Sequence, residues 1–223
     1  MKRRDPERAT SLDAELTAAE IDRIVEGAQC VVIDFHQTLC SGLFFATSEP
    51  PVFEKIERLF WQGAPELQHR WMTGEVTAQQ IARHLSGLVH MPADVIEAAL
   101  REGCRSLPLN EAVWAFARSA RAAGKGTALV TVNADVFSEE IVPAHGLDRV
   151  FETIVNSADH GTTDKRRLWP IAFDRLGDGI GYADSFLIED GEQSPRQFIE
   201  AGGWAYRYHD DVAFANWIES RCC

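Results

Sequence analysis

Three stretches of this chain combine a short apolar run with polar residues that could do chemistry. The run Val31 to Ile33 is β-branched throughout, is too short for a helix, and ends in Asp34. A carboxylate at the end of a buried parallel strand lies where open α/β sheets place their active sites. Asp34 is therefore either an active-site carboxylate or an ordinary strand-end residue that opens a turn. The other polar residues of this kind are Thr131 and Asn133, which flank Val132 after residues 128–130, and Glu189 and Asp190 after residues 185–188.

The types of these residues complement one another. In a parallel sheet the carboxyl ends of the strands share one edge, so the polar side chains can meet in one pocket. Asp34, Glu189 and Asp190 would then bring three carboxylates together, and like charges so close require a cation or a proton. Oxygen ligands favour a hard ion such as Mg²⁺. Thr131, nearby backbone N–H groups and Lys165 would hold an anion beside it.

The elements that would position these residues alternate between strand and helix. Repeated βα units imply right-handed crossovers and a parallel sheet with helices on both faces. We therefore expect an α/β fold with a doubly wound, Rossmann-like parallel sheet. Beyond the first strand, the expected strands cover 128–130, 150–155, 185–188 and 204–208, and the expected helices cover 12–25, 111–123, 164–176 and 194–201, with a further helix start in 135–143.

Residues 41–107 show no strand pattern and are expected to form a helical module inserted after the first strand. Residues 1–40 and 108–223 would then make up the core. Within the module, which should be helical from 52 to 106, Thr77 and Gln80 form a capping box for a helix over 78–85, and Pro92 fits the first turn of a helix over 93–102.

Two features of the module leave their role open. The loop 41–51 is apolar at its centre, so it is either a flap over a pocket or a loop whose phenylalanines cover the core. The spacing of His69, His84 and His90 fits no metal site, and we interpret them as surface or packing histidines.

Composition limits the partners and the compartment. The 223 residues are 45% hydrophobic and 25% charged, and their net charge of −12 disfavours nucleic acid and anionic membranes as partners. No stretch approaches the roughly 18 apolar residues of a membrane span. Five cysteines without a C-x-x-C pair, and no secretory signal, lead us to expect a cytoplasmic protein. A small phosphorylated metabolite remains possible as a partner, because a metal can dominate the field of a site.

The order of the motifs resembles the haloacid dehalogenase (HAD) superfamily. Four stretches carry the resemblance, and the segment 71–77 looks like the cap helices of the subgroup whose helical cap lies between the first and second motifs. The resemblance runs from about Cys30 to Tyr208. The four stretches are Asp34-Phe35-His36-Gln37-Thr38-Leu39 after its strand, Thr131-Val132-Asn133, Lys165, and Ile188-Glu189-Asp190.

The resemblance implies a role for each motif residue. Asp34 would be a nucleophile that takes up a phosphoryl group, and Lys165 would neutralise the nucleophile and the phosphate together. Thr131 and the backbone amide of Asn133 or its neighbour Val132 would hold the phosphate oxygens. Mg²⁺ would be bound by the carboxylates of Asp34 and Asp190, with or without Glu189, and by the backbone carbonyl of His36. The helical cap would exclude water and select the substrate.

One position departs from the family pattern. Phosphatases of this family usually carry an acid–base Asp two residues after the nucleophile, where this chain has His36. An imidazole can exchange protons near neutral pH, so His36 could do the acid–base work. Three outcomes stay open: a working hydrolase, a slowly hydrolysed phospho-enzyme that suits a phosphoryl transferase or mutase, and a weak or inactive relative that binds a phosphorylated ligand or a protein partner.

Two other branches of the superfamily also replace this Asp. Its dehalogenases attack carbon without a metal, which the retained pair Glu189 and Asp190 argues against. Its phosphonate-cleaving enzymes need a cap lysine, and Lys55 lies in a charged run typical of a solvated helix face. The favoured function is therefore Mg²⁺-dependent hydrolysis of a small phosphate monoester through an aspartyl phosphate.

Overall fold

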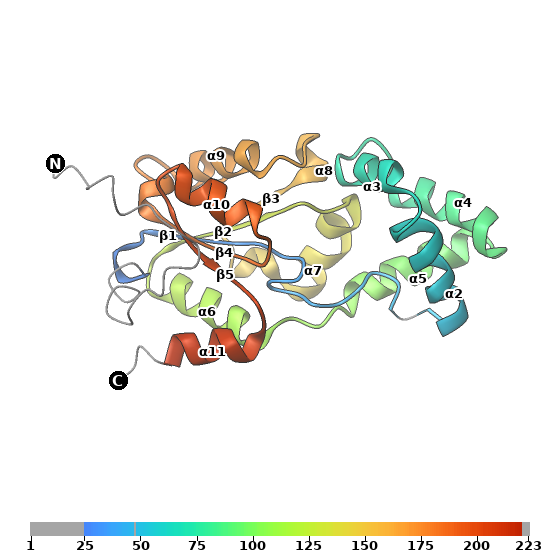
Figure 1. The fold of residues 1–223 in the computed structure, drawn as a ribbon, viewed down its shortest axis with the longest axis horizontal. Coiled ribbons are helices and arrows are strands. Elements are labelled where there is room, and N and C mark those ends of the chain that lie inside the picture. Colours follow the sequence, from blue (N-terminus) through green and yellow to red (C-terminus); the bar gives the residue numbers. More distant parts are fainter. Residues whose placement is uncertain (1–24, 47, 220–223) are drawn as a thin grey trace.

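Five parallel strands form the sheet of this computed structural model, which describes residues 25–46 and 48–219. Their order is β3-β2-β1-β4-β5, so the chain runs outward from β1 to β3 and then returns to build the other half next to β1 (Figure 1). The expected doubly wound α/β fold is confirmed, and its switch point lies between β1 and β4. The strands are β1 (Cys30–Ile33), β2 (Gly126–Thr131), β3 (Thr153–Asn156), β4 (Ser185–Glu189) and β5 (Trp204–Arg207).

Side chains of the central strand alternate between two apolar clusters, as a strand buried on both faces requires. Val31 and Ile33 join a large cluster on one face, while Cys30 and Val32 join a smaller cluster on the other. Helices α6 (Glu111–Ala122) and α11 (Asp211–Glu219) cover the first face. Helices α9 (Lys165–Leu176) and α10 (Gln193–Glu200) cover the second, and the two pairs lie on opposite sides of the sheet in Figure 1.

The strand expected over 150–155 begins later than predicted. Val150 and Phe151 precede β3, and the Val150 carbonyl accepts a hydrogen bond of 2.7 Å from the Thr127 hydroxyl. A side chain therefore satisfies this backbone group where a strand ladder would have done so. Similarly, the region 135–143 holds a π-helical segment, Phe137–Ile141, followed by the short helix α7 (Val142–His145).

The module after β1 is helical, as the sequence predicts, but it is interrupted by three turns. It consists of α2 (Pro50–Ile56), a π-helical segment (Glu57–Trp61), α3 (Pro65–Met72), α4 (Ala78–Val89) and α5 (Ala93–Arg105). We call residues 48–107 the helical insert. Thr77 and Gln80 form the predicted capping box. The helix continues beyond Leu85 to Val89, and Pro92 precedes α5 as its cap residue and is not in its first turn.

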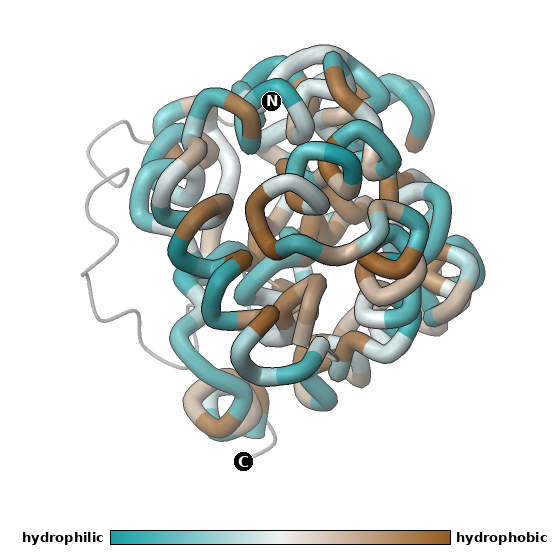
Figure 2. Tube along the Cα trace, turned by 90° about the vertical axis from the view of Figure 1, so that its right-hand side faces the viewer, coloured by the Kyte–Doolittle hydropathy of each residue, from teal (hydrophilic) through white to brown (hydrophobic). Residues whose placement is uncertain are grey.

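The insert shares one apolar cluster with a face of the sheet. Ile81, Leu85 and Leu100 of the insert belong to the same cluster as Val31 and Ile33. Polar and apolar stretches alternate along the insert helices in the end-on view of Figure 2, as helices with one buried face require.

The loop that leads into the insert contributes to the same cluster. Phe44 and Phe45 are buried, and the Phe44 ring centroid lies 5.9 Å from that of Trp71. Of the two roles left open for loop 41–51, this burial supports the covering of the core. The predicted helix over 12–25 lies outside the described residues except for its last residue, and no described helix is long and apolar enough to cross a membrane.

Candidate active site

Carboxylates from two neighbouring strands meet at the switch point of the sheet. Asp34 follows β1, Glu189 is the last residue of β4, and Asp190 comes next. Each offers an oxygen, and these oxygens all lie within 4.8 Å of one another. Asp34 is 5% exposed and Glu189 is 4% exposed, so the repulsion between their charges is poorly screened. The structure therefore brings together the three carboxylates that the sequence placed at one sheet edge.

Lys165, the first residue of α9, is the cation at this cluster. Its Nζ lies 2.8 Å from Asp34 Oδ1 and 2.5 Å from Glu189 Oε2. Burial by itself would lower the pKa of Lys165, but the charges of Asp34 and Glu189 prevail and raise it above its usual value. Lys165 is therefore a permanent positive charge beside the Asp34 carboxylate.

One ammonium does not balance three carboxylates. Burial and the charge of Asp34 raise the pKa of Glu189, although Lys165 opposes the shift, and the same two causes raise the pKa of Asp190. The Thr38 hydroxyl donates to Asp190 Oδ1 at 3.3 Å and accepts from the Asp190 backbone N–H at 3.0 Å, which fixes this carboxylate. A buried set of oxygen donors with excess negative charge fits a hard divalent cation.

Thr131 has the features of an anion-binding group. It ends β2 with its side chain fully buried, and its hydroxyl makes no hydrogen bond in the described part of the chain. An unpartnered buried hydroxyl costs free energy unless a ligand satisfies it. Val132, the next residue, lines the cavity that contains Asp34. Val132 therefore lies at the cavity, whereas a role of Thr131 and Val132 in holding phosphate oxygens stays a prediction.

Asn133 is held by hydrogen bonds within the protein, and the phosphate-binding role expected of its backbone amide or that of Val132 stays a prediction. Its backbone N–H donates to the Ser157 hydroxyl at 2.9 Å, and its side-chain carbonyl accepts from the Ala134 N–H at 2.9 Å. The backbone N–H of Asn133 is thus already engaged within the protein in this conformation. The strand-end pattern could not reveal this because the competing Ser157 lies 24 residues further along the chain.

His36 lies on the wall of the cavity and is exposed. It follows Asp34 by two residues, and its neighbour Gln37 adopts a left-handed backbone conformation with a φ of 59°. The structure thus places the imidazole near the carboxylate cluster, while its acid–base role stays a prediction.

The cavity has a volume of about 510 Å³ and extends beyond the predicted residues. Its other lining residues come from the starts of α9 and α10, and no described residue of the insert lines it. Most of these positions were not singled out from the sequence, although the segments before α9 and after β4 lead into the two helices that carry them. They are Thr163, Asp164, Arg166, Gln193, Ser194 and Gln197.

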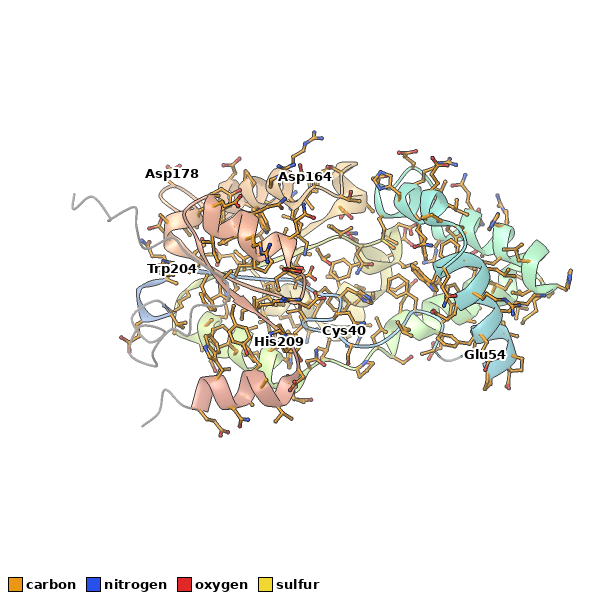
Figure 3. The ribbon with its side chains drawn as sticks, viewed as in Figure 1. Cys40, Glu54, Asp164, Asp178, Trp204 and His209 are labelled. Carbon is orange, nitrogen blue, oxygen red and sulfur yellow. The ribbon has the colours of Figure 1, made fainter. Side chains whose placement is uncertain are left out.

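The charged pair of this wall is neutralised internally. Arg166 Nη2 lies 2.7 Å from Asp164 Oδ2, and the Arg166 backbone N–H donates to Asp164 Oδ1, so Asp164 both caps α9 and binds its neighbour. Figure 3 labels Asp164 at this end of the helix. The remaining wall offers neutral amides and hydroxyls, which favour a polar, uncharged group over a second anion.

Comparisons with known proteins locate this architecture among solved structures. No protein-family model and no curated protein matches the chain. A HAD-family enzyme from Bacteroides thetaiotaomicron, in complex with magnesium and inorganic phosphate, has a TM-score of 0.63 at 14% identity, covering 82% of this chain and 96% of that one. A HAD-like family hydrolase from Porphyromonas gingivalis has a TM-score of 0.62 at 13% identity, covering 87% and 96%.

A third structure, a HAD-superfamily hydrolase from Ehrlichia chaffeensis, has a TM-score of 0.52 at 15% identity and covers 88% of this chain and 98% of its own. At identities this low, the similarity shows the fold.

Proposed function

From the HAD fold that this chain has, we propose that it is a Mg²⁺-dependent hydrolase that removes phosphate from a small phosphorylated metabolite. The observation that carries the proposal is the buried cluster at the switch point, where Asp34 pairs with Lys165 beside Glu189 and Asp190. Its carboxylate excess suits a divalent cation, and the unpartnered Thr131 hydroxyl suits an anion.

The oxygens of Asp34 and Asp190 would hold Mg²⁺, with the His36 carbonyl and with Glu189 where Lys165 releases it. Bound Mg²⁺ would offset the negative charge that gathers when a phosphate approaches three carboxylates. The fit rests on the donor set, since the three carboxylate oxygens lie within 4.8 Å of one another. The Bacteroides enzyme, with its magnesium and phosphate, supports this choice of ion.

The chain's own residues would carry the reaction in two steps. An oxygen of Asp34 attacks phosphorus, the bond from phosphorus to the substrate alcohol breaks, and an aspartyl phosphate forms. Water then attacks that phosphorus, which releases inorganic phosphate and restores the Asp34 carboxylate. The alcohol needs a proton in the first step and the water loses one in the second, and His36 on the cavity wall would supply and accept it.

Two further residues would hold the transferred group. The Lys165 ammonium, already 2.8 Å from Asp34, would stay beside the nucleophile while negative charge builds up on the phosphoryl oxygens. The Thr131 hydroxyl would donate to one of those oxygens. The cavity of about 510 Å³ and its neutral polar wall suit a small phosphate monoester.

The test is phosphate release from a broad panel of phosphate esters with Mg²⁺ at pH 5 to 9. The proposal expects release from at least one ester, and it expects Asp34→Asn to reduce that release by about 10³-fold or more. Activity that persists in Asp34→Asn would contradict the nucleophile.

His36 itself favours a second candidate function, since the acid–base Asp of the family's phosphatases is absent. In this case the protein would bind a phosphorylated ligand or a protein partner without turnover, or it would transfer the phosphoryl group. Restoring the carboxylate in His36→Asp separates the alternatives. No release by the wild type and none by His36→Asp would support binding, whereas a gain by the variant would show intact machinery that lacks its acid.

A further inference from the structure

The loop that follows β2 is bound to the helical insert through one carboxylate. Asp135 Oδ1 accepts a hydrogen bond of 2.7 Å from Trp71 Nε1 in α3, and Asp135 Oδ2 accepts one of 2.8 Å from the Ala78 backbone N–H at the start of α4. Asp135 Oδ1 also accepts from the Val136 N–H at 3.0 Å. A single core residue thus binds two helices of the insert and its own loop.

A second connection reaches the same loop through Ser157. Its hydroxyl donates to the Met72 carbonyl of α3 at 2.6 Å and accepts from the Asn133 N–H at 2.9 Å. The turn between α3 and α4 comes close to the core here. Gly74 has a φ of +72°, and a Cβ on it would lie 2.3 Å from the Ala158 carbonyl oxygen. The turn therefore has no space to shift toward the core.

Both connections end within four residues of Thr131, whose buried hydroxyl has no partner in the described structure. The backbone between Thr131 and Asp135 is short, so the position of its far end restricts the orientation of its near end. We propose that Asp135 is a positioning residue, through which Trp71 and Ala78 of the insert hold the loop after β2 in the conformation that receives the phosphate. This inference rests on the proposed function for its ligand, but its geometry is independent of turnover.

Another contact between insert and core provides the matched control. Arg101 and Arg105 of α5 bind Glu140 at 2.7 Å and 2.8 Å, and within the described residues the Glu140 carboxylate makes no hydrogen bond or ion pair with residues 131–135. A variant at Glu140 therefore weakens the same interface away from the loop. Asp135→Asn and Glu140→Gln remove the same type of charge, so their comparison separates a loop effect from a general loss of docking.

The first measurement is amide hydrogen exchange over residues 132–136. In Asp135→Asn the side chain keeps only one oxygen that can accept the hydrogen bonds from Trp71, Ala78 and Val136. We therefore expect amide exchange in the loop to become faster by about tenfold or more. Glu140→Gln should leave the exchange rates of the loop unchanged, even if it lowers the melting temperature as much as Asp135→Asn does or more. Equal loop exchange in the two variants would overturn the inference.

The second measurement is the affinity for inorganic phosphate with Mg²⁺ present, together with kcat and KM on any ester that the wild type hydrolyses. Asp135→Asn should weaken phosphate binding by about tenfold, and Glu140→Gln should not. Trp71→Phe removes one donor and keeps the carboxylate, so it should produce part of the effect, and it replaces Asp135→Asn if that variant does not fold. If the wild type hydrolyses no ester, the proposed function fails, while hydrogen exchange still decides the role of Asp135.

Discussion

Two clusters of carboxylates and cations can be compared, one at the switch point of the sheet and one at the contact between insert and core. At the switch point, Lys165 faces Asp34 and Glu189 with every side chain less than a tenth exposed. At the contact, Arg101 and Arg105 face Glu140, with Arg101 26% and Arg105 47% exposed. Both clusters hold more carboxylates than cations, but the excess negative charge is buried in the first, whereas the second is partly hydrated.

The difference separates charges arranged for a ligand from charges arranged for docking. Buried like charges raise the free energy of the folded state, so they persist where a bound ion or substrate compensates for them. A hydrated ion pair contributes a modest stabilisation and needs no ligand. Variants in the two regions should therefore differ in how they affect the free energy of unfolding and how they respond to pH.

The largest effect is expected at Lys165. Lys165→Met leaves Asp34 and Glu189 buried without their cation, so the free energy of unfolding should fall by about 3–5 kcal/mol at pH 8 without Mg²⁺. The loss should shrink at lower pH, because protonation of the carboxylates removes the repulsion. Urea denaturation measures both.

Lys125→Met is the control for this variant. Lys125 lies at the opposite end of the sheet, where its Nζ donates to the Ala28 carbonyl at 2.6 Å. Its replacement should cost only about 1 kcal/mol and show no such pH dependence. Similar losses in the two variants would contradict the distinction between the clusters.

The next largest loss of stability is expected at Gly74, in the turn between α3 and α4 that lies against the core. In Gly74→Ala the new methyl group would meet the Ala158 carbonyl and the backbone would keep an unfavourable φ, so we expect a loss of about 2–3 kcal/mol. Gly87, within α4, has open space at its Cβ position, and Gly87→Ala should instead stabilise the protein by up to about 1 kcal/mol. Thermal denaturation of the pair measures the difference, and a neutral Gly74→Ala would show that the turn is loosely docked.

The sequence predicted the residues on the strand ends better than it predicted the contacts around them. Asp34, Glu189 and Asp190 could be placed together because strand ends in a parallel sheet share an edge, and Lys165 because it begins the next helix. The engagement of Asn133 with Ser157, and of Asp135 with Trp71, depends on side chains 24 and 64 residues apart. Local spacing carries no information about such contacts, since they form only when segments far apart in the sequence pack together.

Glu140 should show the pH dependence of a docking charge. Burial raises the pKa of Glu140, but the hydrogen bonds from Arg101 and Arg105 prevail and lower it. A lowered carboxyl pKa stabilises the folded state above the pKa of the unfolded chain, and this contribution disappears as the pH falls through the native pKa. Glu140→Gln should therefore cost about 1 kcal/mol at pH 7 and less near pH 3. Urea denaturation at both pH values is the measurement, and a cost that does not change with pH would contradict the ion pair as its cause.

The smallest change in the free energy of unfolding is expected at two residues that share a strained backbone conformation, one in the core and one in the insert. Gln37 beside the site and His90 at the end of α4 both have a φ of 59°, which glycine adopts without a steric penalty. Gln37→Gly and His90→Gly should each change the free energy of unfolding by only about 0.5 kcal/mol, because the relief of strain is partly offset by the greater freedom of glycine in the unfolded chain.

Their effects on phosphate release should nevertheless differ. Gln37 lies between Asp34 and Thr38, and its N–H donates to the Cys40 carbonyl at 2.7 Å. Glycine there would loosen the turn that orients the nucleophile and the hydroxyl bound to Asp190, so Gln37→Gly should slow release severalfold while His90→Gly does not. Equal rates in the two variants would mean that the turn after β1 is held by its hydrogen bonds alone, and that the left-handed residue beside the site is as purely structural as the one in the insert.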